Sequence, residues 1–419
     1  MRISTNEFLL GSLNDLLAQQ QNVNQLNREI ATGETMLDAS SDPGGAAQVI
    51  GLANQVGTLS YDAANGQAAT QTLQSGVSAL TQVTNLLVQL RQSVTAAANG
   101  TTTQSDRESD IDSAQTLLQQ LVQLANTQGA NGGYLFAGSK SNAPAFSTLP
   151  SGQVVFNGDA GTNQVEVAPS LNVASSISGQ GVFMNVPAGS DGVAVSASGG
   201  NTGTAYALAQ GVTSVSQVAA ASLAGTQYDI SFSGAGSSLA YQVTSGHGTP
   251  GSAGYTATAG IIASGGYVAG SDIGFGGIEM EVTGTPAAGD SFAVQPGATT
   301  SVFQTVQNLV SALGMPQNTV AQGAQAQQAL QNVLADIDGA QTSVLSAQAT
   351  LGTSLAEIQS VQTQTSAQSA NASTVMSNLQ SANLPQVLAN YSESLTALQA
   401  AQLAFSKVQN LTLFQYLQP

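Results

Sequence analysis

The sequence predicts an α+β protein of several domains, in which long antiparallel or coiled-coil helices from both ends of the chain flank an inserted all-β central module. Apolar residues recur at helical spacing up to about residue 135 and again from about residue 301. Between about residues 140 and 300 they alternate in short runs separated by Gly, Ser and Ala stretches, which is the pattern of strands and turns. A length of 419 residues suits two or three domains.

The first predicted helix carries a narrow apolar face and ends at a glycine. Its apolar positions are Leu9, Leu13, Leu16, Val23 and Ile30. Gly33 suits the C-terminal cap, because glycine adopts the left-handed backbone conformation at little cost. The turn that follows contains Ser40, Ser41, Asp42 and Pro43. It predicts a second helix, since Ser41 or Asp42 can accept hydrogen bonds from free N–H groups and Pro43 fits a first turn.

Two further helices are predicted over about 44–98 and 105–128. The second begins with "SDRESDID", whose alternating carboxylates invite a calcium interpretation. An EF-hand loop needs Gly at its sixth position and Glu at its twelfth, where this chain has Ile111 and Leu117. We therefore expect an acid-rich helix start, in which carboxylates interact favourably with the helix dipole, and no metal site. An irregular calcium site is the alternative.

Two stretches of the central region have the pattern of β-hairpins. In residues 228–246 a glycine-rich turn separates two alternating apolar runs, and residues 276–297 repeat the arrangement. His247 follows the first stretch and is predicted to lie in a surface turn. No nucleophile-elbow or phosphate-loop pattern accompanies it. We therefore expect no catalytic residue, no cofactor and no enzyme.

Two long helices are predicted near the C-terminal end. In the first, a strict seven-residue repeat favours packing against another long helix, at Leu330, Ile337, Val344, Leu351 and Ile358. Gly339 and Gly352 lower its intrinsic helicity by about 1 kcal/mol each. The second begins near Pro385 and bears an apolar face at Leu384, Leu388, Tyr391, Leu395, Leu398, Phe405, Val408, Leu411, Phe414 and Leu417.

The first and last helices are expected to pair with each other, which leaves part of each apolar face uncovered. Burial of one such side chain contributes about 1.5–3 kcal/mol. The uncovered faces could fold back on a core of the same chain. The interpretation we favour is burial between copies, so that the apolar positions of both helices form a subunit interface and head-to-tail contacts build a ring or a helical assembly.

Composition excludes several classes of function. The net charge is −17, with six Lys and Arg and none between Ser141 and Ser406, so nucleic-acid binding is not expected. The chain has no cysteine for a disulfide or thiolate metal site. No window approaches 18 uninterrupted apolar residues, so membrane insertion is not expected. The start lacks a basic region before an apolar core, so we expect no cleaved secretory signal.

Several stretches resemble the flagellin superfamily of bacterial flagellar axial proteins. "LNREIATGETMLDASSDPGGAAQVIGL" (26–52) is similar to the end of the superfamily's first helix and the turn behind it. "GGYLFAGSKSNAPAF" (132–146) and "ALQAAQLAFSKVQNLTLFQYL" (397–417) resemble the hook–filament junction branch. "GTPAAGDSFAVQPG" (284–297) resembles the exit from the β module in hook-associated proteins.

The resemblance implies a structural adaptor between hook and filament, assembled as a ring of about a dozen copies. Implied partners are other copies of the chain, hook-associated protein 1, flagellin, and the flagellar export chaperone and export apparatus. Implied localisation is outside the cell, at the hook–filament junction, after type III flagellar export. The alternatives are flagellin, the filament subunit, or an extracellular adhesin or enzyme carried by the β module.

Three domains are expected from this layout. They are a terminal coiled-coil core, a helical bundle and a β-rich outer domain, comprising residues 1–40 with 380–419, 41–139 with 300–379, and 140–299, respectively.

Overall fold

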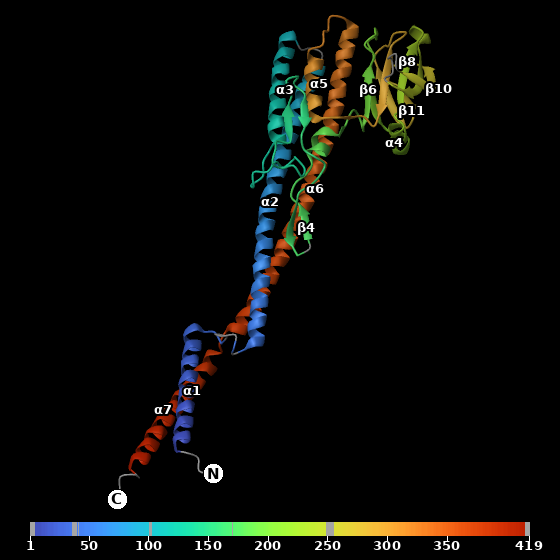
Figure 1. Cartoon of the computed structure of the whole chain (residues 1–419). Helices are drawn as coiled ribbons and strands as arrows, with labels where there is room; N and C mark the ends of the chain where they lie inside the picture. Colours follow the sequence, from blue (N-terminus) through green and yellow to red (C-terminus); the bar gives the residue numbers. More distant parts are fainter. Residues whose placement is uncertain are drawn as a thin grey trace. The chain divides into compact units, whose positions relative to one another are not determined.

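A computed structural model describes residues 5–35, 40, 42–99, 103–169, 171–248 and 255–414. The α+β fold class is confirmed (Figure 1). The helices are α1 Thr5–Thr32, α2 Pro43–Ala98, α3 Gln104–Ala125, α4 Val215–Leu223, α5 Val302–Leu313, α6 Val320–Gln380 and α7 Leu384–Phe414. The chain forms two compact units, residues 1–64 with 361–419 and residues 65–360. Within the described residues, no helix combines the length and apolar character that a membrane span needs.

The strands lie between α3 and α5 in sequence. They are β1 Phe146–Thr148, β2 Val154–Phe156, β3 Gln164–Ala168, β4 Leu171–Ala174, β5 Val186–Pro187, β6 Val193–Ala197, β7 Tyr206–Val212, β8 Gln227–Ser233, β9 Ala240–His247, β10 Thr256–Gly266, β11 Asp272–Phe275, β12 Ile278–Thr283, β13 Ser291–Pro296 and β14 Thr299–Thr300. A short π-helix, Gln180–Met184, and a 3-10 turn, Gly236–Ser238, complete the described elements.

The first unit is built on the pairing of α1 with α7, as the sequence predicts. Val23, Leu26 and Val387 are buried in this unit. α1 ends before Gly33, which has a φ of 73°, the left-handed conformation expected of a glycine cap. Pro385 lies in the first turn of α7, where its missing N–H is not needed.

In the second unit, α2 and α6 run antiparallel. Gln348 Nε2 donates to Thr81 Oγ1 at 3.4 Å, and Arg91 forms an ion pair with Asp338. Residue numbers therefore increase along α2 in the direction in which they decrease along α6. All five heptad positions of α6 from Leu330 to Ile358 are buried. The side of α2 that carries Leu80, Val83, Leu87, Leu90 and Val94 is buried as well. We call the helices of this unit the helical stem: α2 from residue 65, α3, α5 and α6 up to residue 360.

Residues 188–298 form a β sandwich of two sheets. One sheet has the strand order β10-β9-β8-β13-β6 and the other β11-β12-β7. The two sheets share a core of buried side chains, including Ile230, Val243, Met280 and Phe292. The first predicted hairpin is confirmed, because β8 pairs antiparallel with β9.

The second predicted hairpin is wrong. β12 pairs with β11 and β7, whereas β13 pairs with β8 and β6 in the other sheet. The buried Asp290 carboxylate accepts backbone hydrogen bonds from Thr202, Gly203 and Ala287 at 2.8–3.0 Å, which fixes the crossing between the sheets. Alternating apolar residues identify the buried face of a strand but not its neighbour.

Sequence reasoning also missed α4 inside the sandwich. Val218 and Ala221 are buried, three residues apart on one face of this nine-residue helix. So short a segment carries too little periodicity to distinguish a helix from a buried strand. His247 is exposed, as predicted, but it is the last residue of β9 rather than part of a turn.

Candidate functional site

The pair formed by α1 and α7 exposes a set of large apolar side chains. Leu17 is 47% exposed on α1, and Leu403 is 65% exposed on α7. The exposed leucines of the two helices are Leu10, Leu13, Leu17, Leu384, Leu388 and Leu403, which we call the leucine surface. Single exposed leucines are ordinary, but six on one pair of helices leave a large apolar area in contact with water.

The predicted interface residues divide between the inside of this pair and its outside. Val23 is buried, and Leu13 and Leu388 are exposed. The half-buried positions are Leu16, Ile30, Tyr391, Leu395, Leu398 and Phe405. The side chains of Leu9, Val408, Leu411 and Phe414, and the whole of Leu417, lie outside the described residues. The helices thus use part of their apolar faces on each other.

Sequence reasoning missed several members of both sets. Leu26 and Val387 are buried, whereas Leu10, Leu17 and Leu403 are exposed. Leu10 and Leu17 are seven residues apart and flank the predicted positions. A wider apolar face, counted over two turns of helix, would have included them.

Polar side chains interrupt the contact between the two helices. Gln19 Nε2 donates to the Ser394 carbonyl oxygen and Asn22 Nδ2 to Ser394 Oγ, each at 3.4 Å. Ser394 is buried, as is Glu29, whose carboxylate accepts from Gln25 Nε2 at 3.0 Å. The two 3.4 Å hydrogen bonds between the helices contribute little to stability. The apolar contacts therefore dominate the pairing of α1 with α7.

The joint between α1 and α2 lies against the joint between α6 and α7. The Thr35 amide donates to the Gln380 carbonyl oxygen at 2.7 Å, and the Ala382 amide donates to that of Gly33 at 2.8 Å. The Asp42 carboxylate caps α2 by accepting from the Gly45 amide at 2.9 Å. Gly33, Asp42 and the first-turn Pro43 are thus placed as the sequence predicts.

The joint also includes Ser40, Ser41 and the segment 380–382. Ser40 is exposed in a turn, and Ser41 lies outside the described residues. The segment 380–382, which holds the α6–α7 joint against Gly33, was missed. The hydrogen bonds of this segment are made by its backbone groups, so no pattern of side chains in the sequence predicts them.

The "YLFAG" segment lies in a cluster of phenylalanine rings at the base of the strand region. The rings of Phe136 and Phe183 meet edge to face at 5.2 Å between centroids, and Phe183 stacks on Phe303 of α5 at 6.0 Å. Phe146 contacts both Phe183 and Phe303. The ring cluster therefore connects the "YLFAG" segment to α5 of the helical stem.

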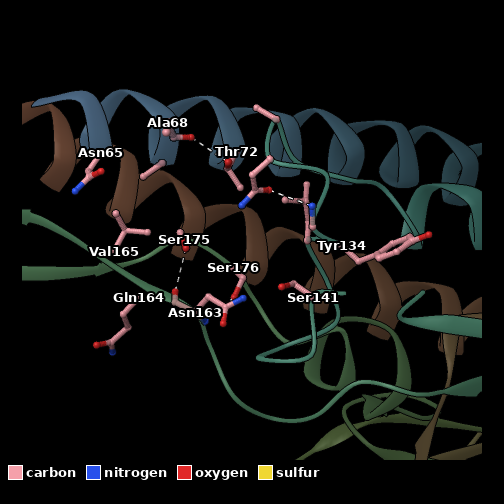
Figure 2. A pocket seen from close by; sticks show the side chains of 15 residues that line it. Asn65, Ala68, Thr72, Tyr134, Ser141, Asn163, Gln164, Val165, Ser175 and Ser176 are labelled. Carbon is pink, nitrogen blue, oxygen red and sulfur yellow. Dashed lines mark hydrogen bonds between the residues drawn. The ribbon is translucent and has the colours of Figure 1, made fainter. Parts of the chain in front are cut away.

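A cavity of about 420 Å³ lies between α2 and the loops beside the "YLFAG" segment (Figure 2). Thr72, Asn163 and Ser176 line it with neutral donors and acceptors, and Thr72 Oγ1 donates to the Ala68 carbonyl oxygen at 2.9 Å. None of its described lining residues carries a charge. The cavity therefore lacks the paired acid and base that hydrolytic chemistry uses.

The acidic string of α3 serves the helix start. Thr103 accepts from the Asp106 amide, and the Asp106 carboxylate accepts from the Thr103 amide at 2.9 Å, which together form a capping box. Thr103 Oγ1 also donates to the Asp106 carboxylate at 2.7 Å, and this hydrogen bond, together with the one from the Thr103 amide, lowers the pKa of Asp106. Within the described part of the chain, no three His, Asp or Glu side chains are grouped to hold a metal ion.

Comparison with known proteins agrees with this layout. Residues 3–141 match the bacterial flagellin N-terminal helical region. Flagellar hook-associated protein 3 of Salmonella typhimurium is 32% identical over 152 residues, and that of Escherichia coli is 30% identical over 171 residues. These alignments cover 36% and 41% of this chain. The chain spans about half the length of these two relatives, 48% and 54% respectively.

Two solved structures from Legionella pneumophila cover more of the chain. Flagellar hook-associated protein 3 is 30% identical, with a TM-score of 0.69, over 78% of this chain and 98% of its own. The flagellar junction protein FlgL is 31% identical, with a TM-score of 0.68, over 80% of this chain and 99% of its own.

Paired terminal helices, an antiparallel helical stem and an inserted β sandwich define a flagellar axial protein of the flagellin superfamily. The sequence-based resemblance to this superfamily is thereby confirmed. The matched relatives are structural proteins of the bacterial flagellum and not enzymes. The chain belongs to the hook-associated protein 3 family.

Proposed function

We propose that this protein is a structural adaptor at the hook–filament junction, where it forms a ring of about a dozen copies through its terminal helices. Its partners are further copies of the chain, hook-associated protein 1 on the hook side and flagellin on the filament side. It reaches this position outside the cell by type III flagellar export, with the help of an export chaperone.

The leucine surface carries this proposal. Six leucines on one pair of helices remain 40–65% exposed, which is unfavourable in water, since burial of a fully exposed leucine contributes about 1.5–3 kcal/mol. Contacts with neighbouring subunits would cover them. On this basis we propose the domain roles as well: residues 1–40 with 380–419 form the inner core, 41–139 with 300–379 the next layer, and 140–299 the exterior.

Deletion of residues 405–419 tests the proposal. We expect cells carrying the truncated protein to release flagellin into the medium and to stop swimming, because filament subunits find no junction on which to assemble. A complementing full-length copy is the control. Filaments of normal number and length in the truncated strain would overturn the junction role, and thousands of copies per filament would identify a filament subunit instead.

A further inference from the structure

The β sandwich is joined to the helical stem through a narrow neck. β5 and β14 form this neck as an antiparallel ladder of two residue pairs, Pro187 with Thr299 and Val186 with Thr300. One further backbone bond joins the Ala188 amide to the Ala298 carbonyl oxygen at 2.9 Å. So short a ladder gives little resistance to rotation, and hinges are typically a few residues at the ends of elements. The orientation of the sandwich therefore depends on other contacts.

A row of polar side chains on α6 supplies such contacts. The Gln328 side chain joins the open edge of β7, where Oε1 accepts from the Ala207 amide at 2.7 Å and Nε2 donates to the Ala207 carbonyl oxygen at 2.8 Å. One turn later, Asn332 Nδ2 donates to the Val195 carbonyl oxygen of β6 at 2.7 Å. Gln328 Nε2 also donates to Asn332 Oδ1 at 2.9 Å, which couples the two amides.

The row continues in both directions along the helix. The buried Asp336 carboxylate accepts from the Gly189 amide, beside the neck, at 2.7 Å. At the other end, Gln325 Nε2 donates to the Gly199 carbonyl oxygen in the loop between β6 and β7 at 3.3 Å. Spacings of three, four and four residues put all four side chains on one face of α6.

These bonds reach both sheets at once. β6 is an edge strand of the five-stranded sheet, and β7 is an edge strand of the three-stranded sheet. Edge strands present backbone groups that need partners, and a buried group without one costs free energy. α6 thus closes the seam between the sheets with side-chain amides, in place of another strand.

We propose that Gln325, Gln328, Asn332 and Asp336 form a latch, which fixes the orientation of the sandwich on its two-stranded neck. The bonds are polar, so water can replace them when the latch opens, and the sandwich then pivots about the neck with its own core intact. The latch is a property of the fold and is independent of the proposed junction role.

Distance measurement between two spin labels tests the latch. The chain has no cysteine, so Leu223→Cys on α4 and Thr353→Cys on α6, both exposed, accept labels at those positions alone. We expect one narrow distance distribution in the otherwise unaltered protein. Combining Gln328→Ala with Asn332→Ala should broaden it or add a second distance. Gln331→Ala, on the same helix but outside the row, is the matched control and should leave it narrow.

Amide hydrogen exchange of Ala207 supplies a second measurement, which does not require the double variant to fold. Asp336→Ala removes the bond to Gly189 and leaves the bonds between Gln328 and Ala207 in place. If the row opens as one unit, exchange at Ala207 is about fivefold faster in Asp336→Ala than in Asp336→Asn, the effect of one lost hydrogen bond. Asp336→Asn is the matched reference, because it also lacks the charge but keeps an acceptor for the Gly189 amide. A distance distribution equal to that of the control, or equal Ala207 exchange in the two Asp336 variants, overturns the latch.

Discussion

Asp336 shows how a single buried carboxyl group can set a pH dependence. Burial removes it from water and raises its pKa to about 6, while hydrogen bonds from the Gly189 amide and the Asn308 side chain act in the opposite direction. The neighbouring Asp338 is already paired with Arg91. Lys and Arg are absent between Ser141 and Ser406, so that long segment supplies no Lys or Arg to pair with the Asp336 carboxylate.

We predict that Asp336→Asn stabilises the protein above about pH 6 and has little effect near pH 4. The folded state holds the proton more tightly than the unfolded chain, so stability falls as pH rises from the unfolded value of 3.8 through about 6. At higher pH, removing the charge should raise the free energy of unfolding by on the order of 3 kcal/mol. Urea denaturation of both proteins at several pH values measures this, and parallel pH profiles would contradict it.

Two glycines of α6 look alike in the sequence and differ in their surroundings. A methyl group on Gly339 would overlap with the Pro187 carbonyl oxygen in the neck, whereas one on Gly352 would meet nothing within 4 Å. Gly339 is therefore needed for the close approach of helix and neck. Gly352 only weakens the helix.

We predict opposite effects of Gly339→Ala and Gly352→Ala. The second should raise the free energy of unfolding by about 0.5–1 kcal/mol through helix propensity alone. Gly339→Ala should lower the free energy of unfolding, because the cost of displacing the Pro187 carbonyl group exceeds that gain. It should also disturb the latch beside it. Chemical denaturation compares the pair directly. Equal stabilisation by both substitutions would show that the neck moves away from helix α6 without a cost in stability.

At the scale of elements, the phenylalanine cluster joins segments that lie far apart in the sequence. Phe136 follows α3, Phe183 lies in the π-helix and Phe303 lies in the first turn of α5, and all three are almost fully buried. The rings contribute through buried area and through edge-to-face contacts. The cluster packs β1 and the π-helix against α5 of the helical stem.

We predict that Phe303→Ala lowers the free energy of unfolding by about 3–5 kcal/mol, because it leaves a cavity among closely packed rings. Phe156→Ala is the comparison, since Phe156 is only half-buried and lies at the edge of the cluster. Phe156→Ala should lower the free energy of unfolding by clearly less than Phe303→Ala. Thermal and urea unfolding measure both, and a loss at Phe303 no larger than that at Phe156 would contradict the role of the cluster.

At the scale of the whole molecule, the leucine surface distinguishes folding from assembly. Leu388 and Leu403 are 51% and 65% exposed on α7, so more than half of the area of each remains in water in the folded chain. In a ring of copies the same side chains would be covered. Their substitution should therefore affect assembly more than stability.

We predict that the combination of Leu388→Asp and Leu403→Asp abolishes swimming while the unfolding transition of the purified protein changes little. New carboxylates would have to be buried without partners in the assembled ring, which is costly. Gln399→Asp, an exposed position on the same helix, adds the same kind of charge and is the control. Swimming assays and sedimentation measure the two effects, and normal motility of the leucine variant would contradict the assembly surface.

The long helices and the joint between α1 and α2 could be predicted from the sequence, because local chemistry sets them. Gly33 and Asp42 act within one turn of chain, and the α6 heptads from Leu330 to Ile358 predict burial through spacing alone. The family motifs near both ends could be recognised in the same way, because each is a continuous stretch of sequence. The packing of α1 with α7 followed from their complementary apolar faces.

The neighbours of each strand and the contacts that hold the sandwich depend on the tertiary fold. The pairing of β12 with β7 instead of β13 depends on contacts between distant segments, which alternation cannot specify. Likewise, Gln328 and Asn332 look like solvent-facing residues in a helical sequence, yet they bind the edges of β6 and β7. A hydrogen-bonding side chain acquires its role from the partner that the fold brings to it, and that partner lies more than a hundred residues away.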